Sequence, residues 1–154
     1  MSKLTRRNFL KTAAAASTVF PLVTIAGTKS SGKVLGANDA IRVGVAGIHG
    51  RGLSHLDAYV GVPGVQVTYL IDPDSSLHES RGKLVKDRGG NDPKCVADVR
   101  AALDDPNLDV VSIATTNHWH SLITIWSCQA GKDVYVEKPI SHNPELFTIA
   151  LHGI

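Results

Sequence analysis

Short runs of β-branched residues alternate with helical segments from residue 41 onward. The apolar runs predict five strands, at Ile41–Ala46, Val65–Ile71, Lys94–Ala97, Val110–Ala114 and Asp133–Val136. The intervening and following segments predict helices at Arg51–Val60, Ser75–Lys86, Val99–Asp104, His118–Ala130 and Pro144–Leu151. The run Val110–Ala114 is apolar on both faces apart from Ser112, as is typical of a central parallel strand. This alternation predicts an α/β fold, a doubly wound parallel sheet with its ligand site beyond the carboxyl ends of the strands.

The first 39 residues follow a different pattern. Residues 5–11 (TRRNFLK) resemble the twin-arginine export motif, and a mildly apolar stretch, Thr12–Ala26, follows them. Fifteen residues are too few to span a bilayer as a helix, so the order basic, apolar, small predicts a signal peptide at 1–26, cleaved after Ala26 or alternatively after Ala37. We therefore expect export to the periplasm or another extracytoplasmic space, a flexible linker at 27–39 and no membrane association after cleavage. A cytoplasmic protein with an amphipathic N-terminal tail is the alternative.

Composition and charge narrow the class of protein. Hydrophobic residues make up 43% and charged residues 19% of the 154, which is typical of a globular domain. The formal net charge of +2 comes partly from the N-terminal segment, so the remainder carries no basic stripe of the kind that binds nucleic acid. The two cysteines lack metal-type spacing, and His118 and His120 have no carboxylate or cysteine at a helpful spacing. We therefore expect neither a nucleic-acid partner nor a metal.

A glycine-rich turn follows the first predicted strand. Residues 47–52 (GIHGRG) match the pattern G-x-G-x-x-G, with His49 in the place of the second glycine. Gly47 would permit the tight turn, and Gly52 would let the helix pack close to the sheet. The backbone N–H groups at the start of that helix favour a pyrophosphate. Gly50, next to the departure at His49, is expected to take over the close approach to the phosphates, and the turn predicts a dinucleotide site.

An acidic residue ends the second predicted strand. Asp72 lies about 20 residues after Gly52, the spacing at which a carboxylate accepts hydrogen bonds from the adenosine ribose in Rossmann folds. Its charge would oppose a 2′-phosphate, which favours NAD over NADP. The alternative role for Asp72 and its neighbours is a strand-ending turn and helix cap.

Two later segments, Ala114–His120 (ATTNHWH) and Gly131–Pro139 (GKDVYVEKP), point to a family. They resemble the glucose–fructose oxidoreductase/inositol dehydrogenase (Gfo/Idh/MocA) family, which shows A-T-P-N/D-x-x-H followed by A-G-K-x-V-x-x-E-K-P. The resemblance covers about residues 41–143. One departure is Thr116, where the family has proline, and this change should loosen the loop without removing backbone contacts.

The resemblance implies an NAD(P)-binding Rossmann domain at residues 40–143 and a role for each matching residue. The pyrophosphate would be lined by Gly47, Ile48, His49, Gly50 and Arg51, and the adenosine ribose held by Asp72. The loop beneath the cofactor would present Thr115, Thr116, Asn117 and His120 toward the nicotinamide. Glu137 would approach the nicotinamide ribose, and Lys138 would orient and polarise a substrate hydroxyl as the catalytic residue.

The resemblance also sets expectations for the whole enzyme. Family members continue with a sixth strand and an α/β substrate domain, whereas residues 144–154 form an atypical tail after which the chain ends. We expect the cofactor half of an oxidoreductase acting on CH–OH groups of sugars or polyols, inactive alone and not itself oligomeric. The alternatives are an NAD-dependent glycosidase of the same family and a non-catalytic or decayed NAD-binding fragment. Outside the site, we expect His55, His78, His142 and His152 on the surface, and Leu122 and Trp126 in the core.

Overall fold

The computed structural model describes residues 40–141, 143, 145 and 148. The predicted signal peptide and linker lie outside the described residues, as do His142, His152 and most of the predicted tail. The expectations for those segments therefore stay predictions.

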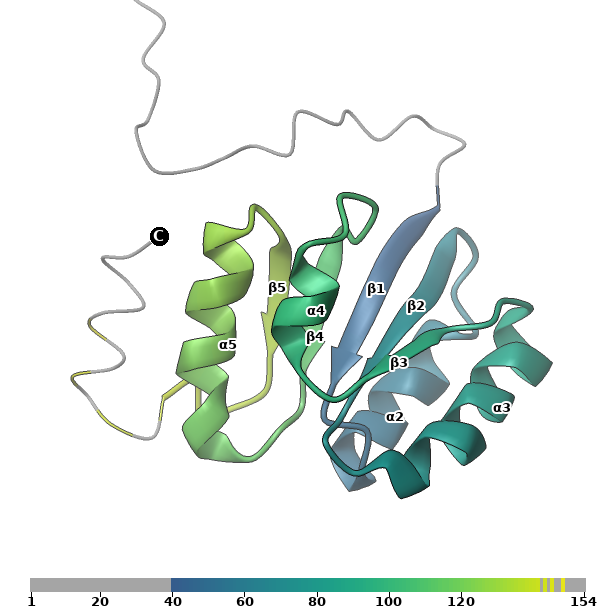
Figure 1. Cartoon of the computed structure of the whole chain (residues 1–154), viewed down its shortest axis with the longest axis horizontal. Helices are drawn as coiled ribbons and strands as arrows, with labels where there is room; N and C mark the ends of the chain where they lie inside the picture. Colours follow the sequence, from purple (N-terminus) through teal and green to yellow (C-terminus); the bar gives the residue numbers. More distant parts are fainter. Residues whose placement is uncertain (1–39, 142, 144, 146–147, 149–154) are drawn as a thin grey trace, which may run out of the picture.

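Five parallel strands form one sheet (Figure 1). The strands are β1 (Ile41–Ala46), β2 (Val65–Ile71), β3 (Lys94–Val96), β4 (Val110–Ile113) and β5 (Asp133–Val136), in the spatial order β3-β2-β1-β4-β5. All neighbouring strands pair in parallel. The chain winds outward from β1 first toward β3 and then, from β4, in the other direction. The order therefore reverses beside β1, which is where a doubly wound sheet opens a ligand crevice.

Helices cover both faces of this sheet. On one face lie α2 (Gly50–Tyr59) and α3 (His78–Gly89), and on the other lie α4 (Val99–Leu103) and α5 (Asn117–Gln129). A short 3-10 turn, η1 (Ser75–Leu77), precedes α3. Gly90, with φ +75°, ends α3 in the left-handed conformation that favours glycine at a helix end.

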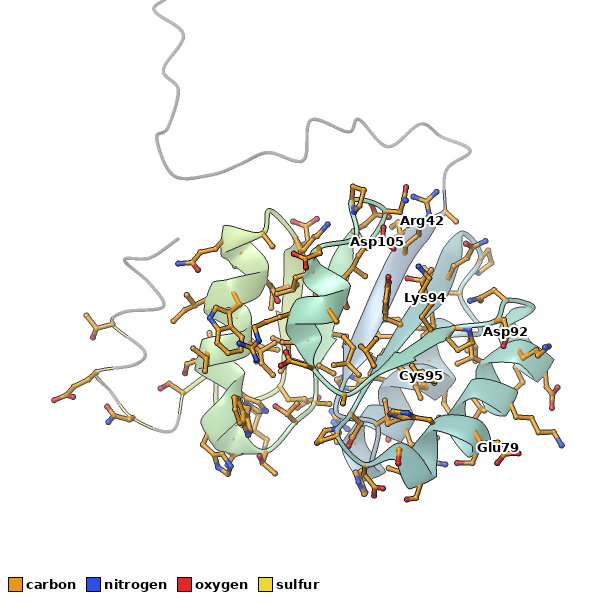
Figure 2. The ribbon with its side chains drawn as sticks, viewed as in Figure 1. Arg42, Glu79, Asp92, Lys94, Cys95 and Asp105 are labelled. Carbon is orange, nitrogen blue, oxygen red and sulfur yellow. The ribbon has the colours of Figure 1, made fainter. Side chains whose placement is uncertain are left out.

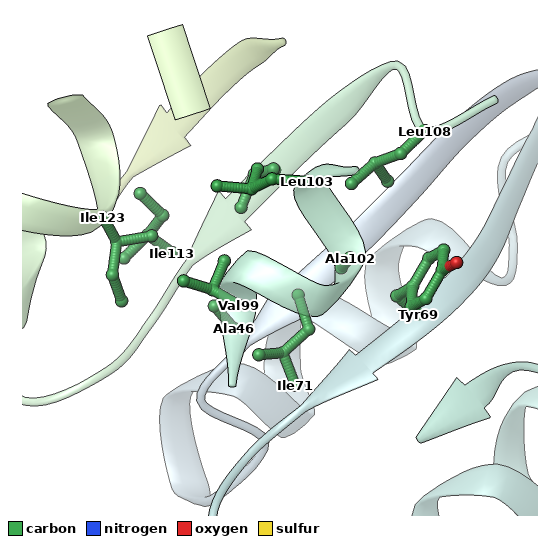
Figure 3. Close-up of a cluster of buried hydrophobic side chains, with 10 residues drawn as sticks. Ala46, Tyr69, Ile71, Val99, Ala102, Leu103, Leu108, Ile113 and Ile123 are labelled. Carbon is green, nitrogen blue, oxygen red and sulfur yellow. The ribbon is translucent and has the colours of Figure 1, made fainter. Parts of the chain in front are cut away.

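Two apolar clusters fill the spaces between the sheet and its helices. Strand side chains alternate between the faces, so in β2 Leu70 packs under α2 and α3 while Tyr69 and Ile71 pack under α4 and α5. Figure 3 shows the cluster between the sheet and helices α4 and α5, where Val99 of α4 and Ile123 of α5 pack on the strands. Burial on both faces explains why the strands are nearly continuous apolar runs.

The end of the sheet opposite the site is held by a polar cluster around Asp105 (Figure 2). The Asp105 carboxylate accepts a hydrogen bond from the Tyr69 hydroxyl (2.8 Å) and lies 3.6 Å from Lys94 Nζ. The buried Lys132 donates from Nζ to the Asp105 carbonyl oxygen (2.7 Å). Lys132, part of the segment that resembles the family, therefore ties the start of β5 to the loop before β4.

The predicted fold class is confirmed, with each predicted strand and the helices up to residue 130 present. The differences are local. The predicted helix from Ser75 begins with a 3-10 turn, because the Asp74 carboxylate accepts the Ser76 N–H and closes a tighter turn. Leu122 was expected in the core, but its side chain lies on the outer face of α5 and is 37% exposed. Trp126 packs against the cluster under α4 and α5, as predicted.

Candidate functional site

The turn between β1 and α2 has the geometry of a phosphate-binding loop. Gly47 has φ +82°, and a Cβ on it would lie 2.6 Å from the Ala114 carbonyl oxygen. A Cβ on Gly52 would overlap the Gly47 carbonyl group. These two positions accept only glycine, for the reasons predicted: a tight turn out of the strand and close packing of the helix on that turn.

His49 occupies the second-glycine position without backbone strain. It is the residue before α2 and has φ −74°, an ordinary value for any residue. Its side chain is exposed and lies 3.4 Å from the Asp74 carboxylate. Gly50 is the first residue of α2, and a Cβ on it would meet nothing within 4 Å. The space above Gly50 is therefore open to a ligand.

Asp72 connects the end of β2 to the glycine-rich turn. Its buried carboxylate accepts the Ile48 N–H on Oδ2 (2.9 Å) and the Asp74 N–H on Oδ1 (2.9 Å). The backbone on either side is tied as well, since Arg81 Nε donates to the Ile48 carbonyl (3.1 Å) and His78 Nε2 lies 2.8 Å from the Asp72 carbonyl. Asp72 thus fixes the shape of the turn and still lines the cavity described next.

A cavity of about 600 Å³ lies at the carboxyl ends of β1 to β4. Its walls come from the ends of four strands, the first turn of α4 and one side of α5. The lining includes residues predicted for the site, namely Gly47, His49, Asp72, Thr115 and Thr116, and residues that were not predicted, namely Asp74, Asp98, Arg100, Trp119 and Trp126. This volume is within the range of sites that hold small molecules and cofactors.

Helices α4 and α5 shape one wall of the cavity. Asp98 caps α4, with its carboxylate accepting the Arg100 N–H (2.9 Å), and the Arg100 guanidinium holds the pKa of that carboxyl at about 2. The same guanidinium lies 5.4 Å from the Trp126 ring centroid. A flat aromatic wall beside an ion pair suits a stacked heterocycle. The one sequence signal for these residues is that Asp98 follows a strand's carboxyl end.

The loop from β4 into α5 brings the predicted threonines to the cavity but not His120. Thr115 and Thr116 line the cavity, and Asn117 begins α5 and is exposed. The buried His120 ring instead places Nε2 3.0 Å from the Thr115 carbonyl and Nδ1 2.7 Å from the Pro139 carbonyl. Both ring nitrogens therefore face backbone oxygens, and His120 clamps this loop to the segment after β5.

Glu137 and Lys138 follow β5 and are separate from the cavity lining. Lys138 is exposed, and it makes no hydrogen bond or ion pair with any residue in the described ranges. Glu137 Oε1 accepts a hydrogen bond from Arg51 Nε (2.7 Å) and lies 3.0 Å from His55 Nε2. These hydrogen bonds, first from His55 and then from Arg51, lower the pKa of Glu137 to about 2. The carboxylate is therefore ionised throughout the neutral range.

The expectation that His55 lies on the surface is wrong. Its side chain is buried, with Nδ1 2.9 Å from Ser112 Oγ and Nε2 on Glu137. Both partners lie more than 50 positions away in the sequence, so no local pattern could have placed this histidine. In the described part of the chain, no group of three His, Cys, Asp or Glu side chains is arranged to hold a metal ion.

Known proteins share this architecture. Residues 41–151 match the Gfo/Idh/MocA model, described as an oxidoreductase family with an NAD-binding Rossmann fold. A glycosyl hydrolase family 109 protein of Shewanella pealeana is 28% identical over 90% of this chain and 34% of its own length. One from Saccharopolyspora erythraea is 29% identical over 87% of this chain and 33% of its own.

Solved structures give the same result. A levoglucosan dehydrogenase in complex with NADH superimposes with a TM-score of 0.66 at 27% identity, covering 75% of this chain and 32% of that one. An NAD-binding oxidoreductase from Klebsiella pneumoniae gives 0.62 at 26% identity, covering 74% and 31%. The chain thus spans about a third of the length of these relatives. It belongs to the Gfo/Idh/MocA oxidoreductase family and forms that family's NAD-binding Rossmann domain.

Proposed function

We propose that the chain holds NAD across the carboxyl ends of its strands. The pyrophosphate lies on the Gly47–Gly52 turn, the adenosine ribose lies at Asp72, and the nicotinamide half lies toward β4 and β5. The observation that carries this assignment is the combination of a turn that accepts only glycine at two positions with a 600 Å³ cavity beside it. Such a turn at a helix N-terminus favours a pyrophosphate.

The residues present fit the cofactor. Arg51 uses only Nε within the described part of the chain, so its two Nη groups remain for phosphate oxygens, and its side chain is 63% exposed. Gly50 leaves open space at the first turn of α2. Asp72 lines the cavity with two oxygens, each of which accepts one backbone hydrogen bond and retains a second lone pair.

We expect NAD in preference to NADP. Two carboxylates, Asp72 and the half-exposed Asp74, lie where the adenosine ribose would sit. Their negative charge opposes a 2′-phosphate and suits a 2′-hydroxyl. His49 beside Asp74 and Arg51 on the turn are the groups that could offset this repulsion.

The full enzyme that contains this domain would oxidise a CH–OH group of a sugar or polyol. When bound, NAD supplies the hydride acceptor. Lys138, exposed directly after Glu137, would orient a substrate hydroxyl and stabilise the alkoxide-like oxygen that develops as the hydroxyl proton passes to a general base of the full enzyme. Support comes from the levoglucosan dehydrogenase, whose structure is also known in complex with NADH and L-sorbose and is 27% identical.

A second candidate is an NAD-dependent glycosidase. The names of the similar glycosyl hydrolase family 109 proteins favour it. Transient oxidation by bound NAD would then serve cleavage of a glycosidic bond, and no net NADH would accumulate. The two candidates share every feature of this domain and differ in the product formed.

NADH fluorescence titration of the purified chain tests the proposed binding. We expect saturable binding of NADH, competition by ADP, and loss of both in the variant Gly52→Val, in which the helix is pushed off the turn. A matched control is Gly82→Ala on α3, where a Cβ meets nothing within 4 Å. Binding unaffected by Gly52→Val would contradict the assignment of the turn.

Export by the twin-arginine route is also proposed, on the motif at residues 5–11. No helix within the described residues is long and apolar enough to cross a membrane. Replacing both Arg6 and Arg7 with lysine should retain a reporter fusion in the cytoplasm, because the export machinery reads the paired arginines. Fractionation of cells carrying each fusion provides the measurement, and undiminished export of the lysine variant would reject the route.

A further inference from the structure

A buried polar chain connects helix α2 with strands β4 and β5. Its centre is His55, which is only 7% exposed. Nδ1 lies 2.9 Å from the hydroxyl of the fully buried Ser112, and Nε2 lies 3.0 Å from Glu137 Oε1. The Tyr59 hydroxyl donates to Ser112 Oγ at 3.0 Å. Ser112 is the polar exception in an otherwise apolar strand, and this chain gives it a partner on either side.

One arrangement of protons satisfies every member of the chain. The Tyr59 hydroxyl donates to Ser112, so the Ser112 proton is free to point to His55 Nδ1. The ring then carries its proton on Nε2 and donates it to the Glu137 carboxylate. Each donor is used once, and a buried network that is fully satisfied holds its members in one geometry. The ring also packs edge-on against Tyr59 and Tyr135, which restricts its rotation.

The carboxylate at the end of this chain has one oxygen occupied and one available. Arg51 and His55 both contact Oε1, whereas Oε2 has no hydrogen bond from any residue that the structure describes. The Glu137 side chain is 12% exposed, so it reaches the surface. It lies directly beyond β5, on the side of the reversal point that receives the second nucleotide in doubly wound sheets.

We propose that His55 is a positioning residue for Glu137: anchored by Ser112, it holds Oε1 so that Oε2 is presented to a ribose hydroxyl in the second half of the dinucleotide. The inference rests on the proposed NAD site. It adds that the orientation of Glu137 is set by α2, the helix whose first turn also carries the phosphate loop. One helix thereby fixes both the pyrophosphate cradle and the carboxylate beside it.

A purely structural role for His55 makes a different prediction from a positioning role. If His55 only stabilised α2, its loss would loosen the phosphate loop and weaken every nucleotide that uses that loop. If it positions Glu137, its loss should weaken only ligands that carry the second ribose. ADP lacks this ribose, whereas ADP-ribose and NADH contain it, so the three ligands separate the two roles.

The experiment is a titration of the purified chain and its variants with these three ligands. In His55→Leu, affinity for ADP-ribose and NADH should fall about ten- to a hundredfold, the size expected for one hydrogen bond to a charged group, while affinity for ADP changes less than about twofold. His55→Gln, which can donate to Glu137 and accept from Ser112, should restore most of the loss. Gly82→Ala on α3 is the control, because it lies outside the polar chain and a Cβ there meets nothing within 4 Å. Equal weakening of ADP in His55→Leu, or full affinity for ADP-ribose, would overturn the proposal.

A second measurement needs no ligand. The carboxyl carbon of Glu137, followed by NMR between pH 3 and 6, should show no titration in the wild type and in His55→Gln. In His55→Leu the pKa of Glu137 should rise toward its ordinary value, with Arg51 as the remaining partner. If His55→Leu does not fold, Ser112→Ala, which removes the partner of both His55 Nδ1 and the Tyr59 hydroxyl, should show the same direction with a smaller change. If no nucleotide binds, the NAD site itself is rejected, and a Glu137 titration that is unaltered in both His55→Leu and Ser112→Ala would reject the role of His55.

Discussion

Gly47 and Gly50 of the glycine-rich turn, and Gly64 directly before β2, are under different constraints. Gly47 combines φ +82° with a Cβ position 2.6 Å from a backbone oxygen, whereas Gly64 has φ +78° and open space around it. Gly47→Ala should therefore lower the free energy of unfolding by about 1–3 kcal/mol for the strained backbone, and further for the steric overlap of the new Cβ. Gly64→Ala should show only the effect of the strained backbone. Gly50→Ala should be neutral or stabilise the chain by up to about 1 kcal/mol.

Urea unfolding followed by tryptophan fluorescence gives this ranking. The urea midpoint should be highest for Gly50→Ala, and should decrease through wild type and Gly64→Ala to Gly47→Ala. A Gly47 variant as stable as the Gly64 variant would mean that the backbone at Ala114 yields at little cost, and that the close approach is not a constraint on the fold.

Asp72 has two roles that a single substitution separates. Asn in its place keeps the shape but offers one oxygen to two N–H donors, so unfolding should become easier by about 1–3 kcal/mol. Removal of the Asp72 charge also removes its repulsion of the 2′-phosphate of NADP. Two unit charges about 5 Å apart repel by roughly 3 kcal/mol at an effective dielectric of 20. The ratio of NADP to NAD affinity should therefore rise at least about tenfold.

Titration of wild type and Asp72→Asn with both cofactors measures that ratio. Asp74→Asn is the comparison variant, because Asp74 is half-exposed, whereas Asp72 is buried, and water screens the Asp74 charge more strongly. It should shift the ratio in the same direction by a smaller factor. A ratio that does not change in Asp72→Asn would place the adenosine ribose elsewhere.

Single residues were predictable from sequence where the backbone alone dictates them. Gly47 and Gly52 follow from the geometry of a strand-to-helix turn, and Asp72 follows from its place at a strand end. His55 was not predictable, because its burial depends on Ser112 and Glu137, which the fold brings together from distant positions. The contacts of His120 were not predictable either, because its ring faces the carbonyl oxygens of Thr115 and Pro139, which the fold brings together from two loops.

At the level of elements, two carboxylates link the strand ends to helices and make stability depend on acid pH. The pKa of Glu137, which joins β5 to α2, is about 2, lowered by His55 and then Arg51. The pKa of Asp98, which caps α4, is also about 2, lowered by hydrogen bonds from Arg100. In the unfolded chain these carboxyls titrate near about 4. The unfolded state therefore takes up protons first as the pH falls.

The stabilisation from both groups is thus complete above about pH 4.5 and is lost as the pH falls toward about 2. Glu137→Gln should flatten the dependence of unfolding free energy on pH in that window, and Asp98→Asn should do so independently because the two share no partner. Urea midpoints at pH 3, 4, 5 and 7 provide the test. An unchanged slope in Glu137→Gln would show that this carboxyl keeps an ordinary pKa in the folded chain.

The elements themselves were predicted well because each strand is a run of residues that must be buried on two faces. The predicted bounds of β1, β2 and β5 match the structure, and the ends that differ do so by one to three residues. Helix α3 is the clearest case. The Asp74 side chain closes a 3-10 turn first, so the α-helix begins at His78 and not at Ser75. Such competition between side chain and backbone is not visible in hydrophobic periodicity.

For the whole molecule, the order β3-β2-β1-β4-β5 follows from right-handed crossovers on a parallel sheet and places every strand's carboxyl end at one edge. The edge was predictable, but the walls of the cavity were not. Arg100, Trp119 and Trp126 reach it from two helices on one face, and their meeting depends on how α4 packs beside α5. Sequence reasoning therefore predicted several residues that line the cavity, while the residues of its wall under α4 and α5 required the structure.

The division between cofactor and substrate surfaces leads to the last prediction. The chain spans about a third of its relatives, and Lys138 is the one catalytic candidate assigned in it. Hydride transfer needs the substrate carbon within about 3–3.5 Å of the nicotinamide in an aligned pose. An exposed lysine cannot impose that pose alone.

We expect the purified 154-residue chain to bind NADH and to produce no NADH from a panel of sugars and polyols, as measured by absorbance at saturating NAD. The same assay with Lys138→Ala sets the background. Turnover above that background would place the substrate surface within the 154-residue chain and contradict a separate substrate domain.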